Sequence, residues 1–341
     1  MDTAALYQTK SYRLFITLVL VGVILALSVV VLGAYVRLTD AGLGCPDWPG
    51  CYGTLTVPQS EAAILQAQVA YPDSTVLVGK AWREMAHRYL AATLGLIVLA
   101  IGLLGWRART EIHVSAWTPS FLLLLISFQA MLGMWTVTML LKPAIVSAHL
   151  LGGMATLGLL TWLAHRHWGH SSATIIRPGR LKTALRIALL ILFTQIFLGG
   201  WTSTNYAALA CTDFPTCHGL WLPEMDFKDA FHLLRELGQS ANGGVLSLAA
   251  ITAIQWTHRV GAVVTFIYLG LLALNLLKYW QLKQLAVTLL LVLCLQIGLG
   301  IANLVLHLPL VLAVAHNFTA GLLLIIVVML NSKVTQPYRQ W

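Results

Sequence analysis

Four histidines at matching positions in the two halves of the chain are of a type that ligates metals. His87 and His258 each precede an arginine, in EMAHR and QWTHR, while His149 and His316 lie early in two other hydrophobic stretches. Paired imidazoles from two facing helices can hold a haem iron between them. A duplication of this kind predicts two sites built to one plan.

The repeat extends beyond the histidines. QAMLG at 129–133 and QIGLG at 296–300 each begin twenty residues before the second histidine of their half. Gly33 and Gly199 each precede a cysteine by twelve residues. Internal duplication is therefore a property of the whole chain.

Small residues follow each histidine by about one helical turn. They are Ala91 and Ala92, Gly152 and Gly153, Gly261 and Ala262, and Ala320 and Gly321. Residues three and four apart share a helix face, so a flat macrocycle would find room beside each imidazole. The alternative is that each histidine is a hydrogen-bonded core residue in a close helix contact, where small residues are also common. The two-by-two repeat favours haem binding.

The two halves differ three positions before the first histidine, where one half has Glu84 and the other has Gln255. A buried carboxylate can exchange a proton during catalysis, and an amide cannot. This difference predicts chemistry at the N-terminal histidine pair and a permanent electron-transfer haem at the C-terminal pair. The alternative for Glu84 is a structural ion pair with Arg88. Arg88 and Arg259 are also candidates to hold haem propionates.

The elements that position these residues must be membrane-spanning helices. The 341 residues are 58% hydrophobic and 10% charged, whereas about 25% of residues are charged in soluble domains. Eight hydrophobic stretches approach or exceed the ~20 residues that span a bilayer. They lie near 14–36, 87–106, 117–137, 143–164, 184–203, 244–277, 285–306 and 310–330. The first is expected to be a retained anchor rather than a cleaved signal peptide.

The distribution of charge predicts the orientation in the membrane. Most lysines and arginines fall on the side of the two termini, and most acids fall on the other side. By the positive-inside rule, both termini are expected in the cytoplasm of a bacterium, with the helices in its inner membrane. The net charge of +9 then reflects orientation, and we expect no nucleic-acid partner, because no basic run is interleaved with aromatic residues.

Two long loops, roughly 38–83 and 204–243, are expected on the outer side. Each contains two cysteines six residues apart, Cys45 with Cys51 and Cys211 with Cys217. The oxidising face of a bacterial membrane favours disulfides at both pairs. Free thiols and a zinc site are the alternatives, although no loop histidine recurs in both halves to complete a zinc site.

Part of the second loop has the pattern of a short amphipathic helix. Near 228–238, apolar and charged residues alternate at helical spacing. This pattern predicts a helix on the membrane surface or, equally, a solvated loop helix.

With these residues in place, the chain closely resembles the haem A synthases, membrane enzymes of bacteria and mitochondria that convert haem O to haem A. The matching segments are LGAYVRLTDAGLGCPDWPGCYG at 32–53, GKAWREMAHRYLAATLG at 79–95, SAHLLGG at 147–153, THRVGA at 257–262 and AHNFTAG at 315–321. The resemblance implies an all-α membrane protein with eight transmembrane helices in two pseudo-symmetric four-helix bundles. Residues 1–170 would form the substrate-haem half and residues 171–341 the haem b half.

The resemblance also implies a role for each site residue. His258 and His316 would bind a low-spin haem b, while His87 and His149 would line the site of the haem O substrate. Glu84 matches the essential carboxylate of the family. The implied reaction oxidises one methyl group of haem O to a formyl group, through successive hydroxylations and loss of water.

The resemblance assigns the cysteines and the partners in the same way. Cys45 and Cys51 match the outer-loop disulfide of the family, whereas the pair Cys211–Cys217 occurs in only part of it. Expected partners are the haem O substrate, membrane lipid, haem O synthase, a membrane electron acceptor and further copies of the chain in a homo-oligomer.

Two other classes of protein compete with this interpretation. A dihaem cytochrome b module that passes electrons without altering a haem would use the same four histidines. The Glu84/Gln255 difference favours the synthase, because a symmetric electron-transfer module needs no acid beside one of its two haems. A transporter built on a parallel repeat would explain the duplication but not the paired histidines.

Overall fold

The computed structural model describes residues 9–112, 115, 117–168, 179–240 and 243–335. Eight of the described helices are long and apolar enough to cross a membrane, which confirms the predicted all-α, eight-span class. They are α2 (Lys10–Leu38), α4 (Val78–Arg107), α6 (Trp117–Thr138), α7 (Pro143–Trp168), α8 (Gly179–Thr204), α10 (Leu248–Leu276), α11 (Lys283–Val305) and α12 (Leu310–Thr335).

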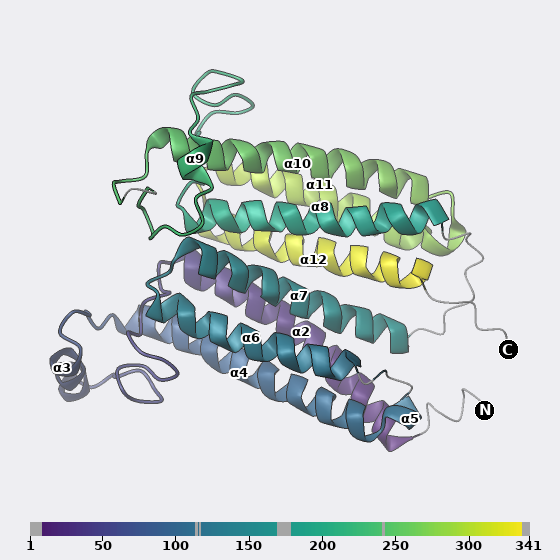
Figure 1. The fold of residues 1–341 in the computed structure, drawn as a ribbon, viewed down its shortest axis with the longest axis horizontal. Helices are drawn as coiled ribbons and strands as arrows, with labels where there is room; N and C mark the ends of the chain where they lie inside the picture. The colour runs from purple at the N-terminus through teal and green to yellow at the C-terminus, as the bar shows by residue number, and fades with distance from the viewer. Residues whose placement is uncertain (1–8, 113–114, 116, 169–178, 241–242, 336–341) are drawn as a thin grey trace.

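The helices contact one another in two groups of four that follow the order of the chain (Figure 1). In the first group, α2 packs against α4 and α7, and α6 packs against the same two helices. In the second group, α8 packs against α10 and α12, and α11 packs against the same two helices. Helices α2, α7, α8 and α12 also make contacts between the groups. The symmetry that we expect to relate the two groups stays a prediction.

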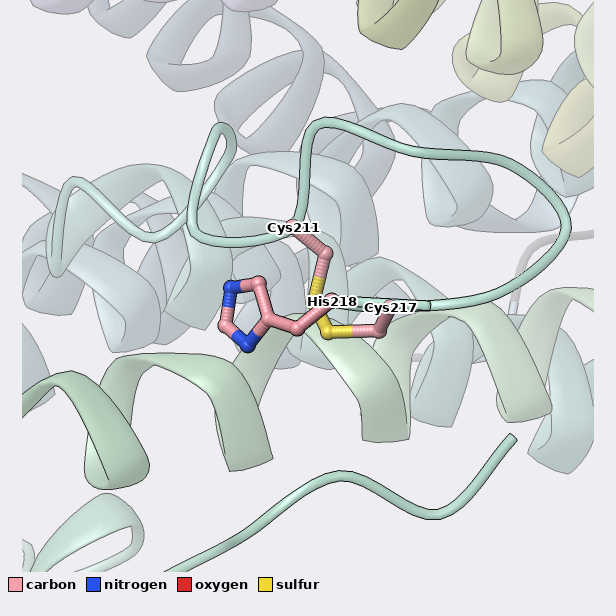
Figure 2. A group of neighbouring side chains, drawn as sticks. All are labelled: Cys211, Cys217 and His218. Carbon is pink, nitrogen blue, oxygen red and sulfur yellow. A yellow bond between two sulfur atoms is a disulfide. The ribbon is translucent and has the colours of Figure 1, made fainter. Parts of the chain in front are cut away.

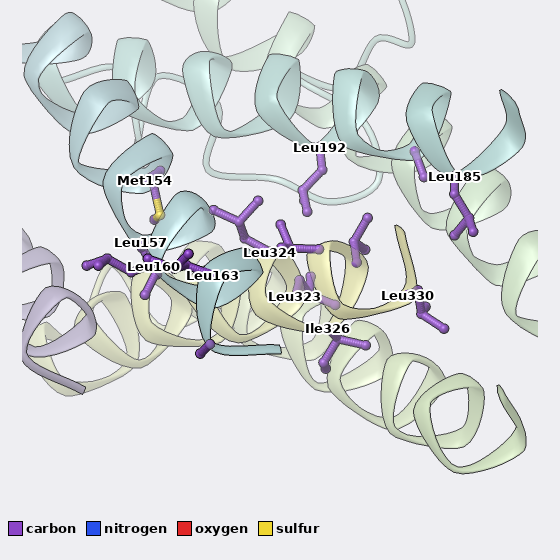
Figure 3. Packing of buried hydrophobic residues seen from close by; sticks show 14 of the residues in the cluster. Met154, Leu157, Leu160, Leu163, Leu185, Leu192, Leu323, Leu324, Ile326 and Leu330 are labelled. Atoms are coloured by element: carbon purple, nitrogen blue, oxygen red, sulfur yellow. The ribbon is translucent and has the colours of Figure 1, made fainter. Parts of the chain in front are cut away.

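An apolar core joins the groups where α7, α8 and α12 meet (Figure 3). Leu157 and Leu160 of α7, Leu185 of α8, and Leu324 and Leu330 of α12 have no exposed surface. A transmembrane interface gains little from the hydrophobic effect, because lipid is as apolar as leucine, so close packing of such side chains supplies the attraction. The core therefore fixes the position of one histidine-bearing group against the other.

Irregular backbone recurs at corresponding places in the two halves. Non-glycine residues with positive φ occur in matched pairs: Asp40 and Tyr206, Tyr52 and His218, Leu140 and His307, and Leu141 and Leu308. The bonds Trp48–Pro49 and Phe214–Pro215 are both cis. Similar segments of sequence therefore fold into similar turns, as the internal repeat predicts.

The two long loops lie at the end of the helices opposite the start of α2 and the end of α12 (Figure 1). The first loop contains a helix that the sequence analysis missed, α3 (Glu61–Ala70), where Ser60 accepts a hydrogen bond from the Ala63 N–H as an N-cap. In the second loop, the helix predicted over 228–238 is wrong beyond its start, because α9 spans only Phe227–Ala230. The remaining short helices are α5 (Arg109–Ile112) and η1 (Trp280–Leu282).

Arg235 gives the physical reason for the short α9. Its buried guanidinium donates hydrogen bonds to the carbonyls of Ala230 and Gln239 and lies 5.6 Å from the centre of the Trp201 ring. Trp201 in turn donates to the same Ala230 carbonyl. These tertiary contacts satisfy the backbone in place of a continued helix, a common way for local helical propensity to be overridden.

Candidate haem sites

A continuous cavity of about 1550 Å³ lies among helices of both groups and is lined by His87, His149, His258 and His316. This volume exceeds the ~300–1,000 Å³ of most small-molecule pockets. The other lining residues are mostly apolar side chains of the spanning helices. The cavity is therefore suited to large apolar ligands rather than to one small polar ligand.

The histidines lie at similar depths in their helices. The helix that carries His87 begins at Val78, earlier than the apolar run near 87–106, and the helix that carries His258 begins at Leu248. At 3.6 residues per turn, all four histidines lie roughly two to three turns from the helix ends nearest the two long loops. They therefore share one level along the helices.

The structure brings the predicted pairs together. The ring centroids of His87 and His149 lie 6.4 Å apart, with planes at 84°. A metal ion bound to both rings at the usual imidazole distance of ~2 Å fits a gap of this order. His258 lies within electrostatic reach of His316. Each pair is thus formed by two helices of the same group.

Each imidazole packs against a glycine of a neighbouring helix. A Cβ added at Gly33, Gly133, Gly199 or Gly300 would lie 2.9, 3.4, 3.2 or 3.1 Å from Cε1 of His87, His149, His258 or His316, respectively. We call these four positions the notch glycines. The sequence marked all four as repeated without giving them a role, and the structure shows that they make room for the rings.

Three of the rings have only a loosely satisfied buried nitrogen. Within the described part of the chain, Nδ1 of His87, His149 and His316 makes no hydrogen bond of good geometry, although backbone carbonyls of Val29, Gln129 and Gln296 lie near the rings. Cradled rings of this kind, at the wall of a large apolar cavity, fit a haem held by paired imidazoles.

Glu84 and Gln255 hold the two cysteine loops in the same way. Glu84 Oε2 accepts a hydrogen bond from the Cys45 N–H at 3.0 Å, and Gln255 Oε1 accepts one from the Cys211 N–H at 2.5 Å. Gln255 Nε2 also donates to the Ala208 carbonyl. Both side chains are buried and line the cavity. The residue three positions before each first histidine therefore anchors a loop, whether it is an acid or an amide.

The arginines that follow the first histidines are partnered by the same loops. Arg88 donates to Glu84 at 2.5 Å and to the carbonyls of Asp47 and Gly50. Arg259 donates to the carbonyls of Thr216 and Cys211, both at 2.8 Å. The ion pair weighed as an alternative role for Glu84 is thus present. Both arginines also line the cavity, and their binding of propionates stays a prediction.

The cysteines form disulfides in both loops, Cys45–Cys51 and Cys211–Cys217. His218 lies beside the second disulfide, and the ligand-type atoms of the three residues fall within 4.8 Å of one another (Figure 2). Both sulfurs are used in the disulfide, however, and Nε2 of His218 lies 2.9 Å from the Ala210 carbonyl oxygen. The structure therefore supports the disulfides over free thiols or zinc.

Sequence reasoning missed the amide partners of the histidines. Gln195 Nε2 lies 3.0 Å from His258 Nδ1, and Gln296 Nε2 lies 3.2 Å from His316 Nε2. Thr319 donates its hydroxyl to Gln296 Oε1. Gln296 stands in a repeated motif that carried a signal, whereas Gln195 has no counterpart in the first half.

The fold and site together define a multi-pass helical membrane protein with two histidine pairs suited to haem. Comparison with known proteins gives the family. Residues 16–328 match the COX15-CtaA family model, described as cytochrome oxidase assembly protein, and the chain belongs to that family.

Its relatives share most of its length. A protein of Shewanella oneidensis described as "Heme A synthase" is 45% identical over 311 residues, which cover 90% of this chain and 93% of the relative. Proteins of the same description from Caulobacter vibrioides and Paracoccus denitrificans are 29% and 27% identical over 91% and 92% of this chain. The predicted resemblance to the haem A synthases is thereby confirmed.

Proposed function

We propose that this protein is a haem A synthase that oxidises a methyl group of haem O to the formyl group of haem A. The observation that carries the proposal is a cavity lined by two histidine pairs, of which, among the described residues, only the first has a carboxylate one helical turn before it. His87 and His149 bind the substrate haem, with Glu84 one turn away. His258 and His316 bind a resident haem b, with the neutral Gln255 at the matching position.

The two halves of the chain divide the work accordingly. Residues 1–170 form the substrate half and residues 171–341 the haem b half, with the boundary outside the described residues. A haem b held by His258 and His316 would supply one-electron transfer. With water as the source of the formyl oxygen, the methyl oxidation releases electrons and protons. The electrons would pass to a membrane acceptor and the protons to a base beside the substrate.

Glu84 is the base that we propose. Its carboxylate is buried on the cavity wall and lies one helical turn before His87, so it shares a helix face with that ring. Its bonds to Arg88 and to the Cys45 N–H hold it in place. A positioned general base typically contributes a factor of about 10²–10⁴ to a rate.

The surroundings of the enzyme follow from its fold and charge. We propose that it lies in the bacterial inner membrane with both termini in the cytoplasm, as the positive-inside rule indicates. Haem O is lipophilic and is proposed to arrive from a haem O synthase in the same membrane. Association with that enzyme and formation of a homo-oligomer belong to the same proposal.

The proposal is tested by extracting pigments from cells that make haem O, with and without this protein, and separating haems B, O and A by chromatography. Haem A is expected only where the protein is present. Stoichiometric haem in the purified protein without any haem A production would instead indicate a dihaem electron-transfer module. Absence of bound haem would contradict both.

The role of Glu84 is tested by Glu84→Gln. Gln255 shows that an amide at this position can still hold a loop through a cysteine N–H, so the variant should fold and bind haem. We expect haem A production to fall by at least about tenfold, because the amide cannot accept a proton. The reciprocal variant Gln255→Glu serves as the control for a change of charge. Unchanged conversion by Glu84→Gln would show that the base lies elsewhere.

A further inference from the structure

The contacts of His258 break a pattern that the other three histidines follow. Backbone carbonyls of Val29, Gln129 and Gln296 approach the rings of His87, His149 and His316, in that order. Each carbonyl belongs to the residue four positions before a notch glycine. Helix carbonyls point toward the residue four positions on, so a glycine there leaves the oxygen accessible to a ring.

At the fourth site, a side chain takes the place of the carbonyl, whereas His316 has both the carbonyl and the side-chain amide of Gln296 nearby. The Gln195 amide Nε2 lies 3.0 Å from His258 Nδ1 and donates to the His258 backbone carbonyl at 3.1 Å. Gly261, one turn after His258, makes room for this amide, because a Cβ there would overlap Gln195 Oε1. Within the described residues, that buried Oε1 has no hydrogen-bond partner.

The first half cannot make the same contact. Gln195 stands four residues before Gly199, and the residue four before Gly33 is Val29. Valine has no polar side-chain atom to offer a ring. The first histidines of the two halves therefore differ in their hydrogen bonding as well as in the neighbouring Glu84 or Gln255.

This difference matters because an imidazole that binds iron through one nitrogen keeps its proton on the other. An acceptor for that proton fixes the ring orientation and makes the imidazole a stronger electron donor to the metal. A stronger donor stabilises the oxidised iron and lowers its reduction potential. In the structure the Gln195 amide turns its N–H group toward Nδ1 and the His258 carbonyl. To accept the Nδ1 proton of an iron-bound His258, the amide must rotate, which gives up the bond to that carbonyl and brings the unpartnered Oε1 to the ring.

We propose that Gln195 is a positioning residue for His258, which orients the imidazole and lowers the reduction potential of the haem held by His258 and His316. The inference rests on the proposed function in one respect, the presence of a resident haem at that pair. The amide thereby makes the two haem sites electronically different.

The test uses the purified, haem-loaded protein and the variant Gln195→Met, which keeps the side-chain length without a hydrogen bond. Gln195→Glu restores acceptor oxygens, and Thr194→Val is the matched control, since the exposed Thr194 hydroxyl bonds only its own helix at Leu190. The measurements are haem content, the midpoint potential from a spectroelectrochemical titration, and the low-spin electron paramagnetic resonance signal.

We expect Gln195→Met to raise the midpoint potential and shift the low-spin signal, while Gln195→Glu keeps or lowers the potential and Thr194→Val changes neither. Loss of haem from Gln195→Met but not from Gln195→Glu also supports the proposal. Haem loss from both variants overturns it, because the amide volume rather than its hydrogen bond would then hold the site. A wild-type potential and signal in Gln195→Met overturns it as well.

These outcomes are independent of the proposed activity. Wild-type protein without a haem at His258 and His316 would defeat the proposed function before any variant is compared. A wild type that holds this haem, with variants of unchanged potential, defeats only the role of Gln195.

Discussion

Each candidate histidine ligand faces a glycine, and the missing Cβ of that glycine makes room for the ring. The notch glycines let the rings of α4, α7, α10 and α12 approach the backbone of a neighbouring helix, and at Gly33, Gly199 and Gly300 an added Cβ would press on the ring. A shift of well under 1 Å is enough to matter, because metal–nitrogen bonds tolerate only about 0.2 Å of error. Ligand position is thus set partly by residues that bind nothing themselves.

Gly300→Ala tests this role. The added methyl group would lie 3.1 Å from Cε1 of His316, so the ring must move. We expect the haem content of the purified protein to fall at least about twofold, measured from the Soret absorbance per protein.

Gly298→Ala is the control, two residues away on α11, where an added Cβ meets nothing within 4 Å. Since alanine is a better helix former than glycine by about 1 kcal/mol, this control should keep its haem and its stability. Equal haem content in the two variants would contradict the role of the notch.

At this scale, the sequence predicts what is repeated and misses what is not. The four histidines could be found because they recur in both halves. Glu84 could be found because the matching position in the second half has Gln255 instead. The histidine partner Gln195 could not, since its counterpart is an ordinary apolar residue, Val29, and because helix-to-helix contacts have no signature along the chain.

Hydrogen bonds attach the two disulfide loops to α4 and α10, the helices that carry His87 and His258. In the second loop, Asp213 accepts hydrogen bonds from the His218 and Gly219 N–H groups and from the Thr216 hydroxyl. These bonds hold the pKa of the Asp213 carboxyl well below its usual range, with the Gly219 bond the largest cause. A pKa lowered in the folded loop means stabilisation that is fully present at neutral pH and is lost progressively as the pH falls below the ordinary pKa of a carboxyl group.

Asp213→Asn should therefore loosen the loop at neutral pH. A neutral acceptor forms weaker bonds than a charged one, so we expect the amide exchange of His218 and Gly219 to rise roughly fivefold. In the wild type, exchange corrected for its intrinsic rate should stay constant from pH 8 to about pH 5. Asp73→Asn, in the exposed part of the first loop, serves as the control. Wild-type loosening across that pH range would refute the assignment.

Elements were predicted as far as their patterns are periodic. The eight spans follow from long apolar runs, although α4 begins at Val78 rather than near 87, because its first turns carry Lys80, Arg83 and Glu84. The loops were predicted less well. Helix α3 has little hydrophobic periodicity from which it could be predicted. The helical pattern near 228–238 was overridden by the tertiary contacts of the buried Arg235.

The two groups of helices also meet, through α2 and α8, at the end of the molecule that carries the two long loops. Arg37 donates to the Ser203 carbonyl at 2.6 Å and lies 4.1 Å from the centre of the Tyr206 ring. Tyr206 donates its hydroxyl to Asp40 at 2.7 Å. Burial raises the pKa of Tyr206, as does its bond to Asp40, so the hydroxyl remains a donor at neutral pH.

Arg37→Ala should weaken the contact between the groups. The guanidinium is largely buried and makes charge-assisted bonds, so we expect a loss of about 1–2 kcal/mol, seen as a lower thermal midpoint in detergent. Lys142→Ala removes an exposed ion pair with Glu236 that also joins the two halves. Exposed pairs contribute about 0–1 kcal/mol, so this control should change the midpoint little. Equal effects would show that Arg37 has no special role.

The grip of α4 and α10 on the two disulfide loops has a consequence for the histidines of these helices. Residues within one turn of His87 and His258 hold the backbone around Cys45 and Cys211, so that loop and ligand are set together. Glu84 and Gln255 hold backbone N–H groups of Cys45 and Cys211, and both cysteines are in disulfides. Reduction of either disulfide is therefore expected to disturb the neighbouring histidine as well as its own loop.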